Sequence, residues 1–221
     1  GTIAAQSSAP AVKATGVSHT FEGGDQKKRV LSDIDFTLKR GEFVILTGPS
    51  GAGKTTLMTL VGTLRTLQTG SIVVLGTELF GLSPQDQLRL RRRIGFIFQD
   101  HNLFDALTVF QTLKLASELC EPRPSHAEVL DKATAVLGAL GMAQYLHRRP
   151  GQLSTGQKQR VAIARALIND PMLILADEPT ASLDREAAHA VIDLVKARVR
   201  QNASVLMVTH DHRIFDVARS E

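Results

Sequence analysis

The feature that most constrains how this chain can fold is a glycine-rich turn between an apolar run and a helix-forming stretch. The turn, Gly48–Thr55 (GPSGAGKT), has the spacing G-x4-G-K-[ST]. The apolar run Phe43–Thr47 precedes it, and the stretch Lys54–Leu64 favours a helix. A strand that continues through such a turn into a helix is half of a βαβ unit. The segment therefore predicts an α/β fold with a parallel sheet.

The residue types in this turn suit the phosphates of a nucleotide. Small residues let successive backbone N–H groups curl around an anion, and a helix that begins near Gly53 points its positive end at the same place. Lys54 would reach the outer phosphates, and the Thr55 hydroxyl can bind Mg²⁺. An incidental glycine-rich turn is the alternative, with a chance of roughly one in a hundred for this spacing. The predicted phosphate-binding residues are Gly48, Pro49, Ser50, Gly51, Ala52, Gly53, Lys54 and Thr55.

Two adjacent carboxylates, Asp177 and Glu178, follow the apolar run Met172–Ala176. A continuously apolar run is typical of a central parallel strand covered on both faces. Ligands of open α/β sheets lie beyond the carboxyl ends of the strands, so both side chains should face the phosphate site. Asp177 would bind Mg²⁺ through water, and Glu178 would polarise the water that attacks the γ-phosphate. An acidic pair that caps a helix is the alternative.

The remaining segments predict a twisted α/β core interrupted by helices. Val12–Phe21 and Val30–Leu38 are expected strands, joined by a polar connection over 22–28. Two consecutive helices, Thr108–Cys120 and His126–Leu140, indicate a helical insertion. Further helices are expected at 84–93, 157–168 and 186–200, and further strands at 94–98 and 204–208. Residues 1–11 are expected to form a flexible lead-in, and residues 12–221 one domain with a helical subdomain at roughly 100–155.

Composition excludes several classes of protein. No apolar stretch approaches the roughly 18 residues that a membrane helix needs. A single cysteine, Cys120, excludes a disulfide scaffold, and the first 11 residues show no signal-peptide pattern. The net charge of +4 suits an anionic ligand, but it is also typical of an ordinary solvated surface.

A second candidate anion site lies at Leu153–Gln157 (LSTGQ), directly before a helix-forming stretch. A serine hydroxyl and a glycine backbone placed at a helix N-terminus can bind an anion. The alternative is an ordinary serine N-cap on a packed helix.

Together these motifs resemble those of the ATP-binding cassette (ABC) ATPases, over nearly all of residues 12–217. The matching elements, in chain order, are Gly48–Thr55, Gln99, Leu153–Gln157 with Arg160, Leu173–Glu178, Ser182–Asp184 and His210. Thr155 departs from the family pattern, where glycine is common. The resemblance implies a P-loop NTPase of the ABC ATPase type. Its fold would be α/β, with a twisted, mostly parallel sheet, an N-terminal antiparallel β subdomain and an inserted helical subdomain.

The resemblance also implies a role for each matching residue. Phe21 would stack on adenine, although a core strand position is the alternative. Glu178, His210 and Lys54 would be catalytic, with His210 contacting the γ-phosphate. Neither spacing nor a third ligand supports the alternative of a metal pair at His210 and His212. Thr56 would hold phosphate, and the Mg²⁺ ligands would be Thr55, Gln99 and Asp177. Residues Ser154, Gly156 and Gln157 would complete the site of a second copy, with Asp184 at the interface.

The implied activity is hydrolysis of ATP to ADP and phosphate, with ATP and Mg²⁺ as cofactors. The implied partners are integral membrane permease subunits and a second copy in an ATP-sandwich dimer, with no nucleic acid. The chain would lie on the cytoplasmic face of the inner (plasma) membrane. Residues 91–104 resemble the exporter branch of lipoprotein-release, macrolide-export and DevA-type heterocyst-glycolipid ATPases, so we expect export. A regulatory ATPase of a cell-division-type membrane complex is the alternative. Leu103, Phe104, Leu107 and Phe110 would receive a helix of the membrane subunit, or else form core.

Overall fold

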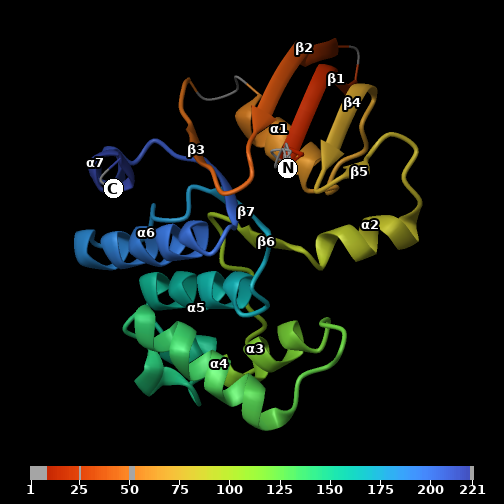
Figure 1. Cartoon of the computed structure of the whole chain (residues 1–221). Helices are drawn as coiled ribbons and strands as arrows, with labels where there is room; N and C mark the ends of the chain where they lie inside the picture. The colour runs from red at the N-terminus through yellow and green to blue at the C-terminus, as the bar shows by residue number, and fades with distance from the viewer. Residues whose placement is uncertain (1–8, 25, 50–52, 220–221) are drawn as a thin grey trace, which may run out of the picture.

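The computed structural model describes residues 9–24, 26–49 and 53–219 (Figure 1). Most of the expected lead-in, residues 1–8, lies outside the described residues, as do Ser50, Gly51 and Ala52 of the glycine-rich turn. Among the described residues, no helix is both long and apolar enough to cross a membrane.

An antiparallel sheet forms one end of the molecule, in the order β2-β1-β4-β5 (Figure 1). Its strands are β1 (Val12–Gly23), β2 (Gln26–Leu38), β4 (Thr69–Val74) and β5 (Thr77–Glu78). The polar connection expected over 22–28 is wrong in extent, because β1 and β2 continue to a tight hairpin in which Gly23 pairs with Gln26. A strand with one exposed face tolerates the charged residues that suggested a loop.

A parallel sheet, in the order β3-β8-β7-β6, forms the centre of the molecule. Its strands are β3 (Phe43–Leu46), β6 (Ile94–Ile97), β7 (Leu173–Asp177) and β8 (Ser204–Val208). In the strand register, Leu46 and Asp177 both pair with Val208, so three strands end at one level. The loops that follow them therefore meet at one edge of the sheet.

Alternate residues of the central strands enter two different cores. Ile174 and Val205 pack toward the helices that cover one face, whereas Leu175 and Leu206 pack with α1 and the antiparallel sheet on the other. All of these side chains are buried, which explains why β7 and β8 are apolar without alternation.

Helices cover the parallel sheet and extend the molecule at the end opposite the antiparallel sheet (Figure 1). α3 and α4 contact each other and α5, and α5 packs on β6. Serine or threonine caps begin α2 to α5, and α5 begins at Thr155 rather than at the expected Gln157, because Ser154 is the cap. The α-helices are α1 (Lys54–Val61), α2 (Pro84–Arg91), α3 (Val109–Ser117), α4 (His126–Ala139), α5 (Thr155–Leu167), α6 (Arg185–Arg200) and α7 (Phe215–Arg219). The 3-10 helices are η1 (Ala143–Tyr145), η2 (Pro150–Gln152) and η3 (His212–Ile214).

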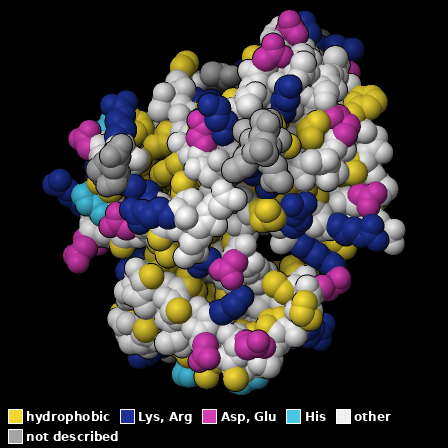
Figure 2. Space-filling model, in the orientation of Figure 1, with side chains coloured by type: hydrophobic (Ala, Val, Ile, Leu, Met, Phe, Trp, Pro, Cys, Tyr) yellow, Lys and Arg dark blue, Asp and Glu magenta, His cyan; other side chains and the backbone are white. Residues whose placement is uncertain are grey.

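Charged side chains of both signs are mixed on the visible face of the molecule (Figure 2). On the face shown in Figure 2, Lys and Arg lie among Asp and Glu instead of gathering in one patch. The small positive net charge is therefore dispersed on this face.

Candidate functional site

A cavity of about 620 Å³ opens where the strands of the parallel sheet end. It collects residues from β1, β2, β7 and β8, from α1 and from the loops that follow the strands, and nine of the residues that the sequence predicted for the nucleotide site are among them. The lining residues are Phe21, Lys28, Val30, Gly53, Lys54, Thr55, Thr56, Gln99, Asp177, Glu178, Ala181, Val208 and His210.

Lys54 lies at the start of α1 and reaches back over the glycine-rich turn. Its ammonium donates to the carbonyl oxygens of Gly48 at 2.6 Å and Pro49 at 2.8 Å. Gly53 is the N-cap residue of α1, so no side chain caps this helix and its first N–H groups face the turn. The start of α1 thus presents a cation and unpaired backbone N–H groups at one place, which is the chemistry that phosphate requires.

Gly53 could not be replaced by a larger residue without moving its neighbours. Its φ of +89° is in the left-handed region, and a Cβ there would lie 2.5 Å from Leu31 Cδ2 and 2.9 Å from the Val30 carbonyl oxygen. This contact ties the start of α1 to β2 of the antiparallel sheet. The sequence motif predicts a glycine here because of anion binding. Close packing against β2 is a second reason for it.

Asp177 and Thr55 face each other across the cavity floor. The Thr55 hydroxyl donates to Asp177 Oδ2 at 3.3 Å. Burial raises the pKa of the Asp177 carboxyl above its ordinary value, the Thr55 hydrogen bond opposes this, and the neighbouring Glu178 charge raises it again. A divalent cation would offset this unfavourable desolvation of the carboxylate.

The donor set suits Mg²⁺ that is completed by substrate and water. Among the described residues, no group of three or more His, Cys, Asp or Glu side chains is placed to hold a metal. For a metal ion, the cavity instead offers the Thr55 hydroxyl, the Gln99 amide and the Asp177 carboxylate. Mg²⁺ usually takes one or two carboxylates together with waters and phosphates rather than an all-protein cage. The residues present therefore fit this ion.

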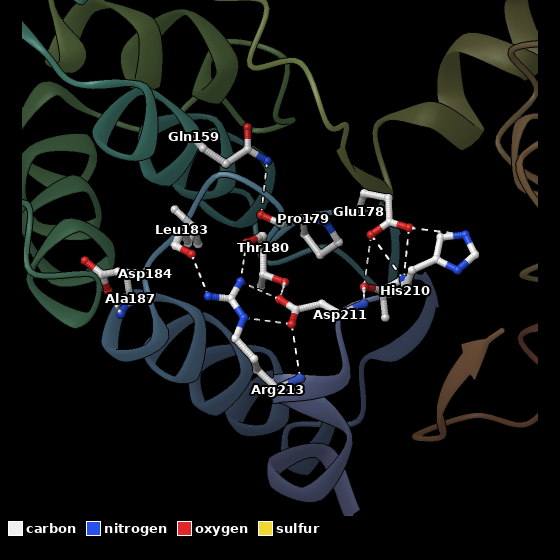
Figure 3. A network of polar contacts seen from close by, with 11 residues as sticks. Gln159, Glu178, Pro179, Thr180, Leu183, Asp184, Ala187, His210, Asp211 and Arg213 are labelled. Atoms are coloured by element: carbon white, nitrogen blue, oxygen red, sulfur yellow. Dashed lines mark hydrogen bonds and ion pairs between the residues drawn. The ribbon is translucent and has the colours of Figure 1, made fainter. Parts of the chain in front are cut away.

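Glu178 is held from the loop that follows β8. Its carboxylate accepts hydrogen bonds from the Thr209 hydroxyl at 3.1 Å and from the backbone N–H of His210 at 3.0 Å. His210 Nε2 lies 3.7 Å from Glu178 Oε1 (Figure 3). Glu178 has a φ of +48°, and its own N–H donates to the Val208 carbonyl at 2.8 Å. The sequence missed Thr209, because a threonine directly after a strand carries no motif of its own.

Phe21 lines the cavity from the antiparallel sheet. The guanidinium carbon of Arg65 lies 4.6 Å from the centre of its ring, and His19 meets the ring edge-on at 4.9 Å. Phe21 is only partly buried, and stacking on adenine stays a prediction. The sequence missed Arg65, because this contact joins two segments that no pattern links.

The residues expected to complete the site of a second copy lie elsewhere in this chain. Ser154 Oγ accepts from the Gln157 N–H at 3.2 Å, and Gln157 Oε1 accepts from the Ser154 N–H at 2.9 Å. Asp184 caps α6 by accepting from the Ala187 N–H at 2.8 Å. A Cβ on Gly156 would lie 3.2 Å from the Ser182 carbonyl oxygen. Neither the residues of the α5 cap nor Asp184 lines the cavity.

The four apolar residues expected to receive a membrane subunit divide into two pairs. Phe104 and Leu107 line an apolar groove of about 530 Å³, and Phe104 is 66% exposed. Leu103 and Phe110 pack against the helical core. Contact with a membrane subunit thus stays a prediction for Phe104 and Leu107. Leu103 and Phe110 match the alternative, a place in the core.

Known proteins resemble this chain over most of its length. A family model described as "ABC transporter" matches residues 31–181. The putative hemin import ATP-binding protein HrtA of Staphylococcus haemolyticus is 42% identical over 204 residues, which cover 91% of each chain. The macrolide export ATP-binding/permease protein MacB of Escherichia coli is 40% identical over 92% of this chain and 31% of its own length.

Solved structures also resemble this chain over most of its length. The dimeric structure of MJ0796, described as a bacterial ABC transporter cassette, superposes with a TM-score of 0.87 at 34% identity, covering 94% of this chain and 90% of that chain. A dimeric post-hydrolysis state of MJ0796 bound to ADP and Pi gives a TM-score of 0.86, also at 34% identity and with the same coverage.

Proposed function

The chain belongs to the ABC transporter family as one of its ATP-binding and ATP-hydrolysing domains, and we propose that it energises export through separate membrane subunits. HrtA, which matches this chain almost end to end, is named as an ATP-binding protein, which supports a separate ATPase subunit. The direction is supported by the exporter-like segment 91–104 and by MacB, although HrtA is named for import. These relatives are transport proteins, which favours transport over the regulatory alternative.

We place the chain on the cytoplasmic face of the inner (plasma) membrane, bound to integral permease subunits. An ATPase that powers a transporter must reach both the ATP pool and the membrane protein that it drives. The groove that contains Phe104 and Leu107 is the surface that we assign to this contact.

The cavity supports a specific division of work among its residues. Phe21 stacks on the adenine ring. Residues 48–53, Lys54 and Thr56 bind the phosphates, and Lys54 exchanges its two loop carbonyls for phosphate oxygens. Thr55, Gln99 and Asp177 would hold Mg²⁺, which would neutralise the negative charge of the outer phosphates.

The hydrolytic step falls to Glu178. Its carboxylate takes a proton from the attacking water, and the hydrogen bonds from Thr209 and His210 hold it in place. The His210 side chain, 51% exposed beside this carboxylate, contacts the γ-phosphate.

A second copy completes the site. The cavity is open to solvent and this chain holds Ser154, Gly156 and Gln157 outside it, which supports the assignment of further γ-phosphate donors to another chain. The dimeric structures of MJ0796 support such a pairing. Asp184, exposed at the start of α6, lies at the interface that we propose.

The observation that carries the proposal is the convergence of Lys54, Asp177, Glu178 and His210 at one sheet edge. The test is Glu178→Gln, which keeps the size of the side chain and removes the base. We expect kcat for ATP hydrolysis to fall by about 10²–10⁴ while ATP binding persists. With ATP and Mg²⁺, gel filtration should show a dimer.

Two controls sharpen this test. Glu186→Gln removes a carboxylate from the exposed first turn of α6 and should leave turnover unchanged. Lys54→Ala should abolish ATP binding, because the phosphates lose their cation. A monomeric elution profile of Glu178→Gln would contradict the sandwich, and failure of a co-purifying membrane protein to stimulate turnover would contradict the coupling.

A further inference from the structure

Three residues of the polar network in Figure 3, Thr180, Asp211 and Arg213, have no part in the roles proposed above. The hydroxyl of buried Thr180 donates to Asp211 Oδ2 at 2.7 Å. The Arg213 guanidinium meets the same carboxylate as a fork, with Nε 2.8 Å from Oδ1 and Nη2 2.7 Å from Oδ2. These bonds lower the pKa of Asp211 to about 2, so the pair stays charged at neutral pH. Two parallel bonds fix the orientation of the guanidinium as well as its position.

The same guanidinium holds the backbone of the turn 180–183. Arg213 Nη1 donates to the Leu183 carbonyl at 2.9 Å, and Nη2 donates to the Thr180 carbonyl at 3.2 Å. Leu183 directly precedes Asp184, the residue that we place at the contact with a second copy. Both ends of the turn between Glu178 and Asp184 are thus attached to one side chain.

The segment that carries Arg213 also contacts Glu178. The Asp211 N–H donates to the Thr209 hydroxyl at 3.0 Å, and that hydroxyl donates to Glu178 Oε2 at 3.1 Å. The His210 N–H donates to the same carboxylate. Within the segment 209–213, Thr209 and His210 contact the proposed base Glu178. Asp211 and Arg213 of the same segment contact the turn 180–183.

The far side of the turn is fixed as well. Gln159 of α5 is buried, and its Nε2 donates to the Pro179 carbonyl at 3.2 Å and to the Phe98 carbonyl at 2.9 Å. Phe98 precedes Gln99 of the cavity. The residues after Glu178 are thus held between α5 on one side and Arg213 on the other.

We propose that Arg213, oriented by Asp211, is a positioning residue for ATP hydrolysis that makes the Asp184 contact and the Glu178 base move as one unit. The proposal rests on the dimer proposed above. Arginine suits the task because its planar fork binds a carboxylate and two carbonyls at once, which the compact ammonium of lysine cannot do. A second copy that presses on Asp184 would then adjust Glu178 through the turn 180–183.

The test compares Arg213→Ala and Arg213→Lys with Arg200→Ala, which removes an exposed arginine near the end of α6. We expect Arg213→Ala to lower kcat about tenfold or more, since a small misplacement of a reacting group is costly. Affinity for ATP should stay within about twofold of wild type, because Arg213 does not line the cavity. The kcat of Arg213→Lys should lie between those of Arg213→Ala and wild type, and the kcat of Arg200→Ala should match wild type.

A second readout follows the dimer. In the Glu178→Gln background, Arg213→Ala should raise the dissociation constant of the ATP-bound dimer about tenfold, a change of about 1.4 kcal/mol. The proposal is overturned if kcat and dimerisation both stay within about twofold of wild type. It is also overturned if kcat, ATP affinity and the thermal midpoint all fall together, because that pattern indicates general destabilisation. If Glu178→Gln alone forms no dimer, the proposed function fails, and kcat alone then decides the role of Arg213.

Discussion

Replacing Gly53 by alanine tests whether packing, and not only the anion, requires this glycine. An alanine held at a φ of +89° is strained by about 1–2 kcal/mol. Its Cβ would also lie 2.9 Å from the Val30 carbonyl oxygen, which cannot move without β2, and 2.5 Å from Leu31 Cδ2. Overpacking of this kind costs about 1–3 kcal/mol, so we expect the free energy of unfolding to fall by about 2–5 kcal/mol.

The same substitution should weaken ATP binding. If the strain is relieved by a shift of the first turn of α1 away from β2, Lys54 and Thr55 move with it. A shift of about 1 Å at such a site can cost up to about a hundredfold, so we expect ATP affinity to fall at least tenfold.

Urea unfolding and calorimetric titration with ATP measure the two effects. Gly23→Ala is the matched control in the same sheet, because a Cβ at Gly23 meets nothing within 4 Å. We expect this control to change the free energy of unfolding by no more than about 0.5 kcal/mol. The reasoning is refuted if Gly53→Ala matches the control in both measurements.

Three further predictions concern the Phe21 ring, the Asp211–Arg213 ion pair and the hydrophobic core around α4. Phe21→Leu should raise the dissociation constant for ATP about five- to a hundredfold, because stacking on an aromatic ring is worth about 1–3 kcal/mol per base. The same change at Phe80, which is 60% exposed and does not line the cavity, should have no effect in the same titration. The ionised form of Asp211 stabilises the fold above its ordinary pKa of 3.8, and this contribution is lost as the pH falls toward about 2. The stability lost in Asp211→Asn, about 1 kcal/mol at neutral pH after screening by solvent, should therefore shrink below pH 4 in urea unfolding. Leu137→Ala, at a fully buried position of α4, should lower the free energy of unfolding by about 2–5 kcal/mol.

The central strands could be predicted because burial alone identifies them. β7 and β8 are covered on both faces, so Leu173–Ala176 and Val205–Val208 are continuously apolar and no register is needed to recognise them. The α/β fold of the ABC ATPase type, which the resemblance implied, is confirmed by the solved relatives. Strand β4 was missed, because Thr69–Val74 begins with turn-like residues. Its Gly70 is required by β1, since a Cβ there would lie 2.5 Å from the Gly16 carbonyl oxygen.

The site could be predicted as far as chain connectivity determines it. Residues that follow parallel strands meet at one edge, and the register of Leu46, Asp177 and Val208 brings them to one level. Arg65 and Thr209 could not be predicted, because their contacts are made by side chains from segments that share no local pattern. The partners of Arg213 are of the same kind.

The two explanations weighed for Ser154, an N-cap and an anion site, do not exclude each other. In the cap, Ser154 Oγ and Gln157 Oε1 both act as acceptors. A serine hydroxyl also carries a proton, and a glutamine amide carries two, so capping leaves the donors of both side chains for another partner. Capping also fixes both side chains at the start of α5, where the backbone N–H groups of the first turn add to the positive end of the helix. The cap thus prepares the donors that a triphosphate held by a second copy would meet.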